Sequence, residues 1–248
     1  IRCFEEVDTV IHLSGESISK KWSKKNKKEI LESRILSTRL LKNGLEKTLN
    51  RKISNIICSS AIGVYPNSLD EVFNEKTKII QKNFLQEIVI KWEKELQKLS
   101  SLTKNFSIIR IGLVLSVNGG ILPRLALPVR LFIGAAFGSG RQWQSWIHIS
   151  DLTRMFLEFS ENEWYGLFNA VSPNPVTQRN FLKVLGQSIN RPVFFPNIPS
   201  SIIKLILGER SILVLGSQKV SCDLIVEKGF SFKYNKLDEA LEDIYKKV

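Results

Sequence analysis

The stretch best suited to binding chemistry runs from residue 138 to 151 and reads GSGRQWQSWIHISD. Arg141 follows a Gly-Ser-Gly turn, and its planar guanidinium can hold an anionic substrate group through two parallel hydrogen bonds. Trp146 and His148 lie two apart, hence on one face of an expected strand. The closing Ser150-Asp151 pair can cap the next helix, and Asp151 can form a latch with His148. An aromatic corner of the core with a solvated arginine is the alternative interpretation.

Small or polar residues also stand where three buried strands are expected to end. These are Ser14-Gly15, Ser59-Ser60 and the run Arg110-Ile111-Gly112. Parallel sheets of α/β proteins bind ligands beyond the carboxyl ends of their strands, so this edge is a candidate ligand site. A buried cation such as Arg110 needs an acceptor, either a ligand or a structural partner. His12, inside the first strand, is expected to be a core residue with one nitrogen hydrogen-bonded.

Alternating apolar strands and amphipathic helices must position these residues. The first half of the chain predicts β-α-β-α-β, and therefore a Rossmann-type parallel sheet with right-handed crossovers. A Pro-containing apolar segment, two more helices and a strand follow, and the chain ends in short helices. The expected elements are strands at 7–15, 53–60, 106–111 and 166–171, helices at about 23–49, 84–99, 151–158 and 177–189 (capped by Thr177), the apolar segment 122–133, and short helices from 196 onward.

Composition indicates an ordinary globular protein. Of 248 residues, 43% are hydrophobic and 24% charged, and no apolar run approaches the roughly 18 residues that span a bilayer. We expect no signal peptide and no membrane partner. The three cysteines are far apart and lack a CxxC pattern, which predicts neither a disulfide framework nor a metal site. A reducing compartment follows, the cytoplasm with a plastid as the alternative.

The net charge of +12 is concentrated in a lysine cluster at residues 20–28 around Trp22. The cluster lacks the interleaved arginine and aromatic side chains that nucleic-acid-binding proteins use to contact bases. Such a lysine cluster is typical of a solvated helix start, so no nucleic-acid partner is expected. A phosphate-bearing small ligand would also favour this positive field.

Taken together, these motifs resemble the extended short-chain dehydrogenase/reductases, and more closely the atypical epimerase family within that superfamily. The resemblance covers essentially the whole chain in order. The matching motifs are 10–16 (VIHLSGE), 32–34 (ESR) with 38–39 (TR), 59–65 (SSAIGVY), 92–93 (WE), 110–115 (RIGLVL), 138–151, 169–177 (NAVSPNPVT) and 216–220 (GSQKV).

The resemblance implies a site built at the strand ends. It implies NADP as the cofactor, with NAD as the alternative, and a substrate of unknown identity. Ser14 and Gly15 would line the ribose on the nicotinamide side, while Arg34 and Thr38 would reach the cofactor edge from one helix face. Arg34 paired with Glu32 or Glu29 on the helix surface is the alternative. The full expected set is Leu13, Ser14, Gly15, Arg34, Thr38, Ser59 and Arg110 for the cofactor, and Gly112, Arg141, Trp146 and His148 for the substrate.

Two departures from the superfamily concern chemistry. A Gly-rich β-α-β-α portion that would hold the pyrophosphate is expected before Ile1, on the order of 50 to 60 residues. The Tyr-x-x-x-Lys pair, in which the lysine lowers the tyrosine pKa for proton transfer, is replaced by Leu85 and Val89. Ser60 matches the serine that holds the substrate oxygen. Tyr65 is the nearest phenol that can substitute as acid.

Two functions from different classes follow. The first is an NAD(P)(H)-dependent, epimerase-like oxidoreductase, and the second is a catalytically inactive cofactor-binding regulator resembling division inhibitors of cells or plastids. We expect an incomplete Rossmann-like domain at 1–176 and a mostly helical substrate-side domain at 177–248, which resembles DUF1731 from about 198. The resemblance also implies a homodimer formed through the helices at 23–49 and 84–99, as is common in the superfamily.

Overall fold

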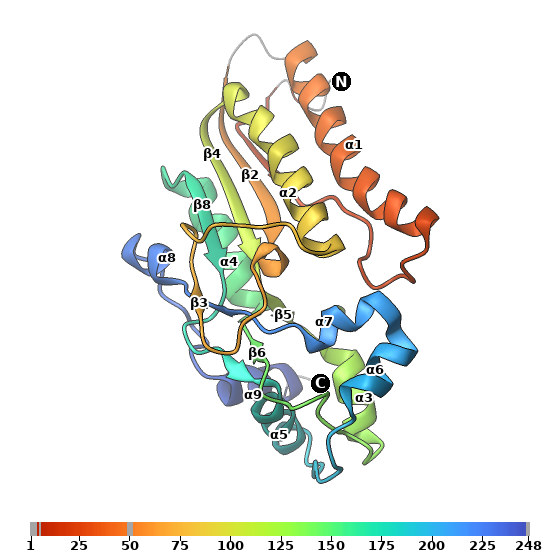
Figure 1. The fold of residues 1–248 in the computed structure, drawn as a ribbon. Coiled ribbons are helices and arrows are strands. Elements are labelled where there is room, and N and C mark those ends of the chain that lie inside the picture. The colour runs from red at the N-terminus through yellow and green to blue at the C-terminus, as the bar shows by residue number, and fades with distance from the viewer. Residues whose placement is uncertain (1–3, 5, 49–51, 247–248) are drawn as a thin grey trace. The chain divides into compact units, whose positions relative to one another are not determined.

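A four-stranded sheet forms the centre of the fold in the structure, a computed structural model that describes residues 4, 6–48 and 52–246. Its strand order is β1-β2-β4-β8, and β1 pairs in parallel with β2 from Thr9 opposite Asn55 to His12 opposite Cys58. The strands are β1 (Thr9–His12), β2 (Ile53–Ala61), β4 (Thr103–Ile111) and β8 (Gly166–Ala170). This is the α/β Rossmann-like sheet that the alternating pattern predicted (Figure 1).

By its internal contacts the chain divides into two compact units, each discontinuous in sequence. The first comprises Ile1–Val64, Lys78–Arg110 and Arg154–Phe168. The second comprises Tyr65–Thr77, Ile111–Thr153 and Asn169–Val248.

In the first unit, α1 (Lys24–Thr48) and α2 (Phe84–Leu96) pack against each other, and α2 runs along β2 (Figure 1). The buried cluster beneath them includes Leu45, Ile56 and Trp92. Asn83 caps α2, because its side chain accepts from the backbone N–H of Gln86 at 3.1 Å. The amphipathic spacing of both helices therefore determines which face covers the sheet.

The second unit is mostly helical, with three two-stranded sheets. Its strands are β3 (Val72–Phe73), β5 (Leu113–Leu115), β6 (Trp143–Gln144), β7 (Trp146–His148), β9 (Val176–Thr177) and β10 (Lys219–Val220). Its helices are α3 (Leu122–Arg130), α5 (Gln178–Ser188), α6 (Ser200–Leu207), α7 (Ile212–Leu215), α8 (Asp223–Glu227) and α9 (Leu237–Lys246). Helix α4 (Ile149–Glu161) crosses the division between the units.

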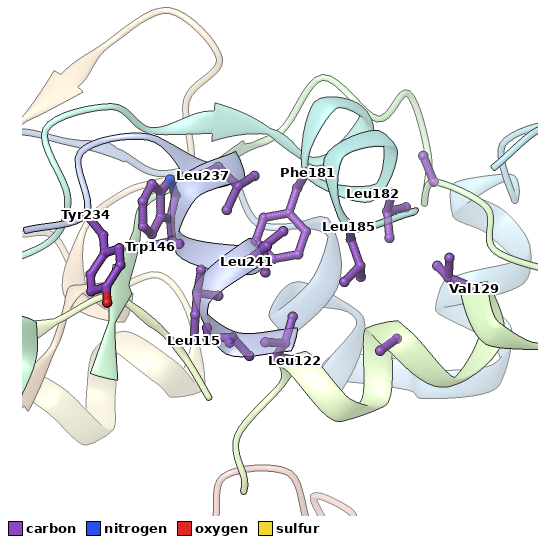
Figure 2. Close-up of a cluster of buried hydrophobic side chains, with 14 residues drawn as sticks. Leu115, Leu122, Val129, Trp146, Phe181, Leu182, Leu185, Tyr234, Leu237 and Leu241 are labelled. Atoms are coloured by element: carbon purple, nitrogen blue, oxygen red, sulfur yellow. The ribbon is translucent and has the colours of Figure 1, made fainter. Parts of the chain in front are cut away.

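One continuous core holds the second unit together. Trp146, which is 0% exposed, packs with Phe181 of α5 and with Leu237 and Leu241 of α9 (Figure 2). Burying one such side chain stabilises the fold by about 1.5–3 kcal/mol. The expectation of an aromatic core corner is therefore correct for Trp146.

Several expected elements differ from the observed ones. The first strand is shorter, because only residues 9–12 pair with β2. The helix from Phe84 stops at Leu96 and continues as a 3₁₀ turn over Gln97–Leu102. The Pro-containing segment is a helix, α3, since Pro123 lies in its first turn, where a missing N–H costs nothing. Within the described residues, no helix is both long and apolar enough to cross a membrane.

Candidate functional site

A chain of three polar side chains lies at the carboxyl ends of β2 and β4 in the first unit. The Ser60 hydroxyl donates to Glu93 Oε1 at 2.6 Å. Arg110 grips the same carboxylate through Nε at 2.8 Å and Nη2 at 2.7 Å. The side chains of Arg110 and Glu93 are 6% and 16% exposed. Glu93 is thus the acceptor that the buried Arg110 was expected to require.

This geometry determines what Ser60 can offer to a ligand. Its single proton is directed at an ionised carboxylate, and charge-assisted hydrogen bonds of this kind are short and strong. The oxygen keeps acceptor capacity, so it can receive a hydrogen bond from a ligand hydroxyl. In this arrangement its proton is not available to a ligand carbonyl.

A second network fixes the end of β1. Ser59 Oγ donates to the His12 carbonyl at 3.1 Å, and His12 Nε2 lies 3.1 Å from Thr38 Oγ1. Because Thr38 donates its own proton to the Arg34 carbonyl at 2.7 Å, His12 is the donor to Thr38. Burial lowers the His12 pKa, which favours this neutral form. His12 is therefore the hydrogen-bonded core histidine that the sequence predicted.

Arg34 holds the loop that follows β1. Its Nη1 donates to the Glu16 carbonyl at 3.0 Å and to the Ile30 carbonyl at 2.9 Å. The guanidinium carbon also lies 5.1 Å from the centre of the Trp92 ring. Arg34 does not pair with Glu29 or Glu32, which pair with lysines one turn earlier.

The backbone that Arg34 supports is open. Leu13 is 59% exposed, and Ser14 and Gly15 are exposed as well. A Cβ on Gly15 would come within 3.1 Å of the Arg34 guanidinium carbon. The buried indole N–H of Trp92 has no hydrogen-bond partner among the described residues. An exposed strand end with open backbone is a place where a ligand can approach.

The positions of the missing tyrosine and lysine are apolar in space as well as in sequence. Val89 is 4% exposed in the core, and Leu85 is half-buried one turn earlier. Lys91 on the same helix pairs with Glu87 at 2.5 Å. The lysines at the start of α1 form similar exposed i,i+4 pairs, as expected of a solvated helix start.

In the second unit, the structure buries two of the expected substrate residues, Trp146 and His148. Trp146 is fully buried and donates to the Asn174 carbonyl at 3.0 Å. His148 is 2% exposed, stacks at 3.9 Å on Tyr234 and lies 3.6 Å from Asp243. A Cβ on Gly112 would come within 2.5 Å of the Ser145 carbonyl, so this glycine permits close backbone packing.

The expected Ser150-Asp151 cap is wrong, because α4 already begins at Ile149. Asp151 instead lies in the first turn of α4, fully buried. Its carboxylate accepts from the backbone N–H groups of Lys233 and Tyr234, both at 2.9 Å. It therefore ties α4 to the segment before α9.

Tyr65 lies in the interior of the second unit. It is 1% exposed, stacks on Phe73 at 5.7 Å between ring centres and donates to Asn169 Oδ1 at 2.8 Å. Arg141, by contrast, is exposed, and its backbone N–H bonds to Ser139 Oγ at 3.2 Å.

A pocket of about 770 Å³ opens within the second unit. Half of its lining residues carry a hydroxyl or amide side chain, and its one charged lining residue is Lys204. Ser217 donates to the Ser68 carbonyl at 2.6 Å and accepts from the Trp143 N–H, so the 216–220 motif forms part of the wall. Its polar lining residues are Asn67, Ser68, Ser139, Gln142, Ser200, Lys204, Ser211 and Ser217. The 216–220 motif was identified in the sequence, but its hydrogen bonds with the segment near residue 68 could not be predicted from it.

The described part of the chain contains no cluster of three or more His, Cys, Asp or Glu residues that could hold a metal. Cys58 and Cys222 are free and buried. Burial raises the pKa of both thiols, that of Cys222 to about 12 with a further contribution from Asp223. Neither thiol is therefore poised as a nucleophile. Cys3 lies outside the described residues.

Comparisons with known proteins match the whole length of the chain. Residues 198–244 match the family model described as a domain of unknown function, DUF1731. An epimerase family protein of Staphylococcus aureus (strain MRSA252) is 38% identical over 244 residues, which cover 98% of this chain and 81% of the relative. An epimerase family protein of Staphylococcus epidermidis (strain ATCC 12228) is 37% identical over 97% of this chain and 80% of its own length.

Solved structures agree with the fold. The human epimerase family protein (isoform 2), crystallised with NADPH, superposes with a TM-score of 0.91 at 29% identity, covering 98% of this chain and 83% of that one. The UDP-glucuronic acid 4-epimerase of Bacillus cereus, solved with UDP-glucuronic acid and NAD, gives a TM-score of 0.77 at 17% identity over 99% of this chain and 77% of that one. The second match supports the fold alone.

Proposed function

The chain belongs to the epimerase family, and on that premise we propose that it is an NADP(H)-binding oxidoreductase acting on an alcohol or carbonyl substrate. The observation that carries the proposal is the Ser60–Glu93–Arg110 chain at the strand ends, beside the open backbone of residues 13–15. The NADPH-bound human relative favours NADP over NAD.

The residues present fit the nicotinamide half of such a cofactor. Exposed backbone after β1 allows close approach. Arg34 would support the cofactor indirectly by fixing the Glu16 carbonyl and with it the loop. The nicotinamide, when bound, supplies the redox half of an alcohol–carbonyl interconversion.

Ser60 has a defined role in this proposal. Its oxygen accepts the hydroxyl hydrogen of an alcohol substrate, while Glu93 fixes the rotamer of Ser60 and Arg110 fixes Glu93. Both carboxylate oxygens of Glu93 are occupied by Ser60 and Arg110, so Glu93 serves as an anchor rather than as a base. The pocket lined by Lys204 and Ser217, taken within the second unit, offers hydroxyl and amide groups and one cation, which suits a polar or anionic ligand. Arg141, exposed in the same unit, would bind an anionic group.

Titration with NADPH and NADH, followed by energy transfer from tryptophan to nicotinamide, tests the cofactor step. The protein used should carry the Gly-rich unit that the family resemblance implies before Ile1. We expect micromolar binding, about −8 kcal/mol. Leu13→Asp should weaken binding at least tenfold, whereas Leu40→Asp, at a 74% exposed position of α1, should not. Absence of binding up to millimolar cofactor would overturn the proposal.

A second candidate is a regulator that binds the cofactor without turnover. It is favoured by Leu85 and Val89 in place of the tyrosine and lysine, and by the burial of Tyr65 against Asn169. Cofactor binding without NADPH oxidation across a panel of carbonyl compounds would support it. Reduction of NADP⁺ by an alcohol that Ser60→Ala abolishes without weakening cofactor binding would support the oxidoreductase.

A further inference from the structure

The second unit exposes large apolar side chains from three segments, here called the apolar face. Leu127 and Leu131 lie one helical turn apart at the end of α3, followed directly by Phe132 and Ile133. Phe194 and Phe195 stack on each other before α6. Helix α6 itself presents Ile202, Leu205 and Ile206, of which Leu205 is 86% and Ile206 69% exposed. Contiguous exposed apolar surface of this kind usually marks an interaction site.

Backbone hydrogen bonds hold these segments next to one another. The Gly138 N–H donates to the Ile198 carbonyl, and the Ile198 N–H donates to the Ala136 carbonyl, both at 2.8 Å. The chain that leaves α3 is therefore paired with the chain that enters α6. The Arg191 guanidinium also lies 5.0 Å from the centre of the Phe132 ring and links the aromatic segment to the end of α3.

The segments that form the apolar face carry only positive charge, and the exposed Glu209 follows α6 directly. From residue 96 to 150, and again from 164 to 208, the sequence contains no aspartate or glutamate. These two stretches supply every residue of the apolar face. They also supply exposed cations beside it, namely Arg124, Arg130, Arg191 and Lys204.

We propose that the apolar face is a membrane-contact surface that adsorbs to anionic lipid. Exposed leucine, isoleucine and phenylalanine fit the boundary between headgroups and acyl chains, and a rim of arginine and lysine fits anionic headgroups. A second copy of this chain is a poorer occupant, since apposing two such faces would bring cations of like sign together. The proposal differs from the expectation, drawn from the sequence, that the protein has no membrane partner.

Cosedimentation with lipid vesicles tests the proposal. The wild-type protein should sediment with vesicles of phosphatidylcholine containing phosphatidylglycerol, and much less with phosphatidylcholine alone. Added salt should release it, because screening weakens attraction to the headgroups. Arg124→Gln should lower partitioning about fivefold, the contribution of one cation near an anionic surface.

The decisive variant is Leu205→Glu with Ile206→Glu. Both side chains are largely exposed, so the fold should persist, as circular dichroism would check, and vesicle binding should fall at least tenfold. Leu40→Glu is the matched control, since Leu40 is 74% exposed on α1 of the other unit, and its binding should equal that of the wild type. Unchanged binding of the double variant would overturn the proposal. So would a wild-type dimer that fails to bind vesicles and that the double variant converts to a monomer.

Discussion

Replacing Glu93 with glutamine should show how firmly the candidate site is built into the first unit. The substitution keeps the shape of the side chain and removes the charge that Arg110 holds at 2.7–2.8 Å. Arg110, 6% exposed on its side chain, would then be a buried cation without its carboxylate. Breaking a buried pair from one side costs about 3–5 kcal/mol. Because Glu93 retains some exposure, we expect a loss near the lower end, about 3 kcal/mol.

Urea unfolding of the variant and the wild-type protein measures this loss. With a typical slope of about 1–3 kcal/mol per molar urea, the midpoint should fall by about 1 M or more. The control is Glu87→Gln on the same helix, which removes an exposed i,i+4 pair with Lys91. An exposed pair of this kind contributes only about 0.3–0.5 kcal/mol.

A double-mutant cycle separates the pair from its surroundings. Removing both charges, with Glu93→Gln and Arg110→Met, should cost less than the sum of the two single changes. A loss in Glu93→Gln no larger than in Glu87→Gln, or a coupling energy within error of zero, would refute the buried-pair interpretation.

Three further predictions follow from burial and packing. Burial lowers the pKa of His12 in the folded protein below its ordinary 6.5, so the unfolded chain takes up the proton first as the pH falls. The free energy of unfolding should therefore decrease below about pH 6.5. His12→Gln should reduce this pH dependence, as urea unfolding at several pH values would show. The Cys58 and Cys222 thiols, with raised pKa values, should resist thiol reagents in the native state and react only on unfolding, as peptide mapping would show. Gly216→Ala should destabilise the protein by about 1–3 kcal/mol in thermal or urea unfolding, since its Cβ would come within 2.6 Å of the Ile212 carbonyl.

Local signals in the sequence predicted the elements well. Thr177 caps α5 as expected, accepting from the Asn180 N–H at 3.3 Å. Apolar residues recur about every 2 positions in strands and every 3.6 in helices, because each element buries one face. This spacing predicted the order of the strands and helices. Helix α3 was not predicted, because proline usually interrupts a helix and this segment contains two. In the structure, one proline lies in the first turn of α3 and the other in the last.

Long-range partners were beyond prediction from one sequence. Ser60 and Glu93 are 33 residues apart, and only the packing of α2 against β2 brings them to hydrogen-bond distance. The division into units is likewise discontinuous, so no single change of composition along the chain marks it. The apolar face was hidden for the same reason, because an apolar helix reads as core until its exposure is known.

NADPH affinity is the measurement that tests the central claim most directly. If the strand-end site is a cofactor site, fluorescence titration of the protein carrying the Gly-rich unit implied by the family resemblance should give a micromolar dissociation constant. Leu13→Asp should raise that constant at least tenfold, and Leu40→Asp should leave it unchanged. Binding that neither variant alters would place the cofactor elsewhere. No binding up to millimolar NADPH would contradict the account.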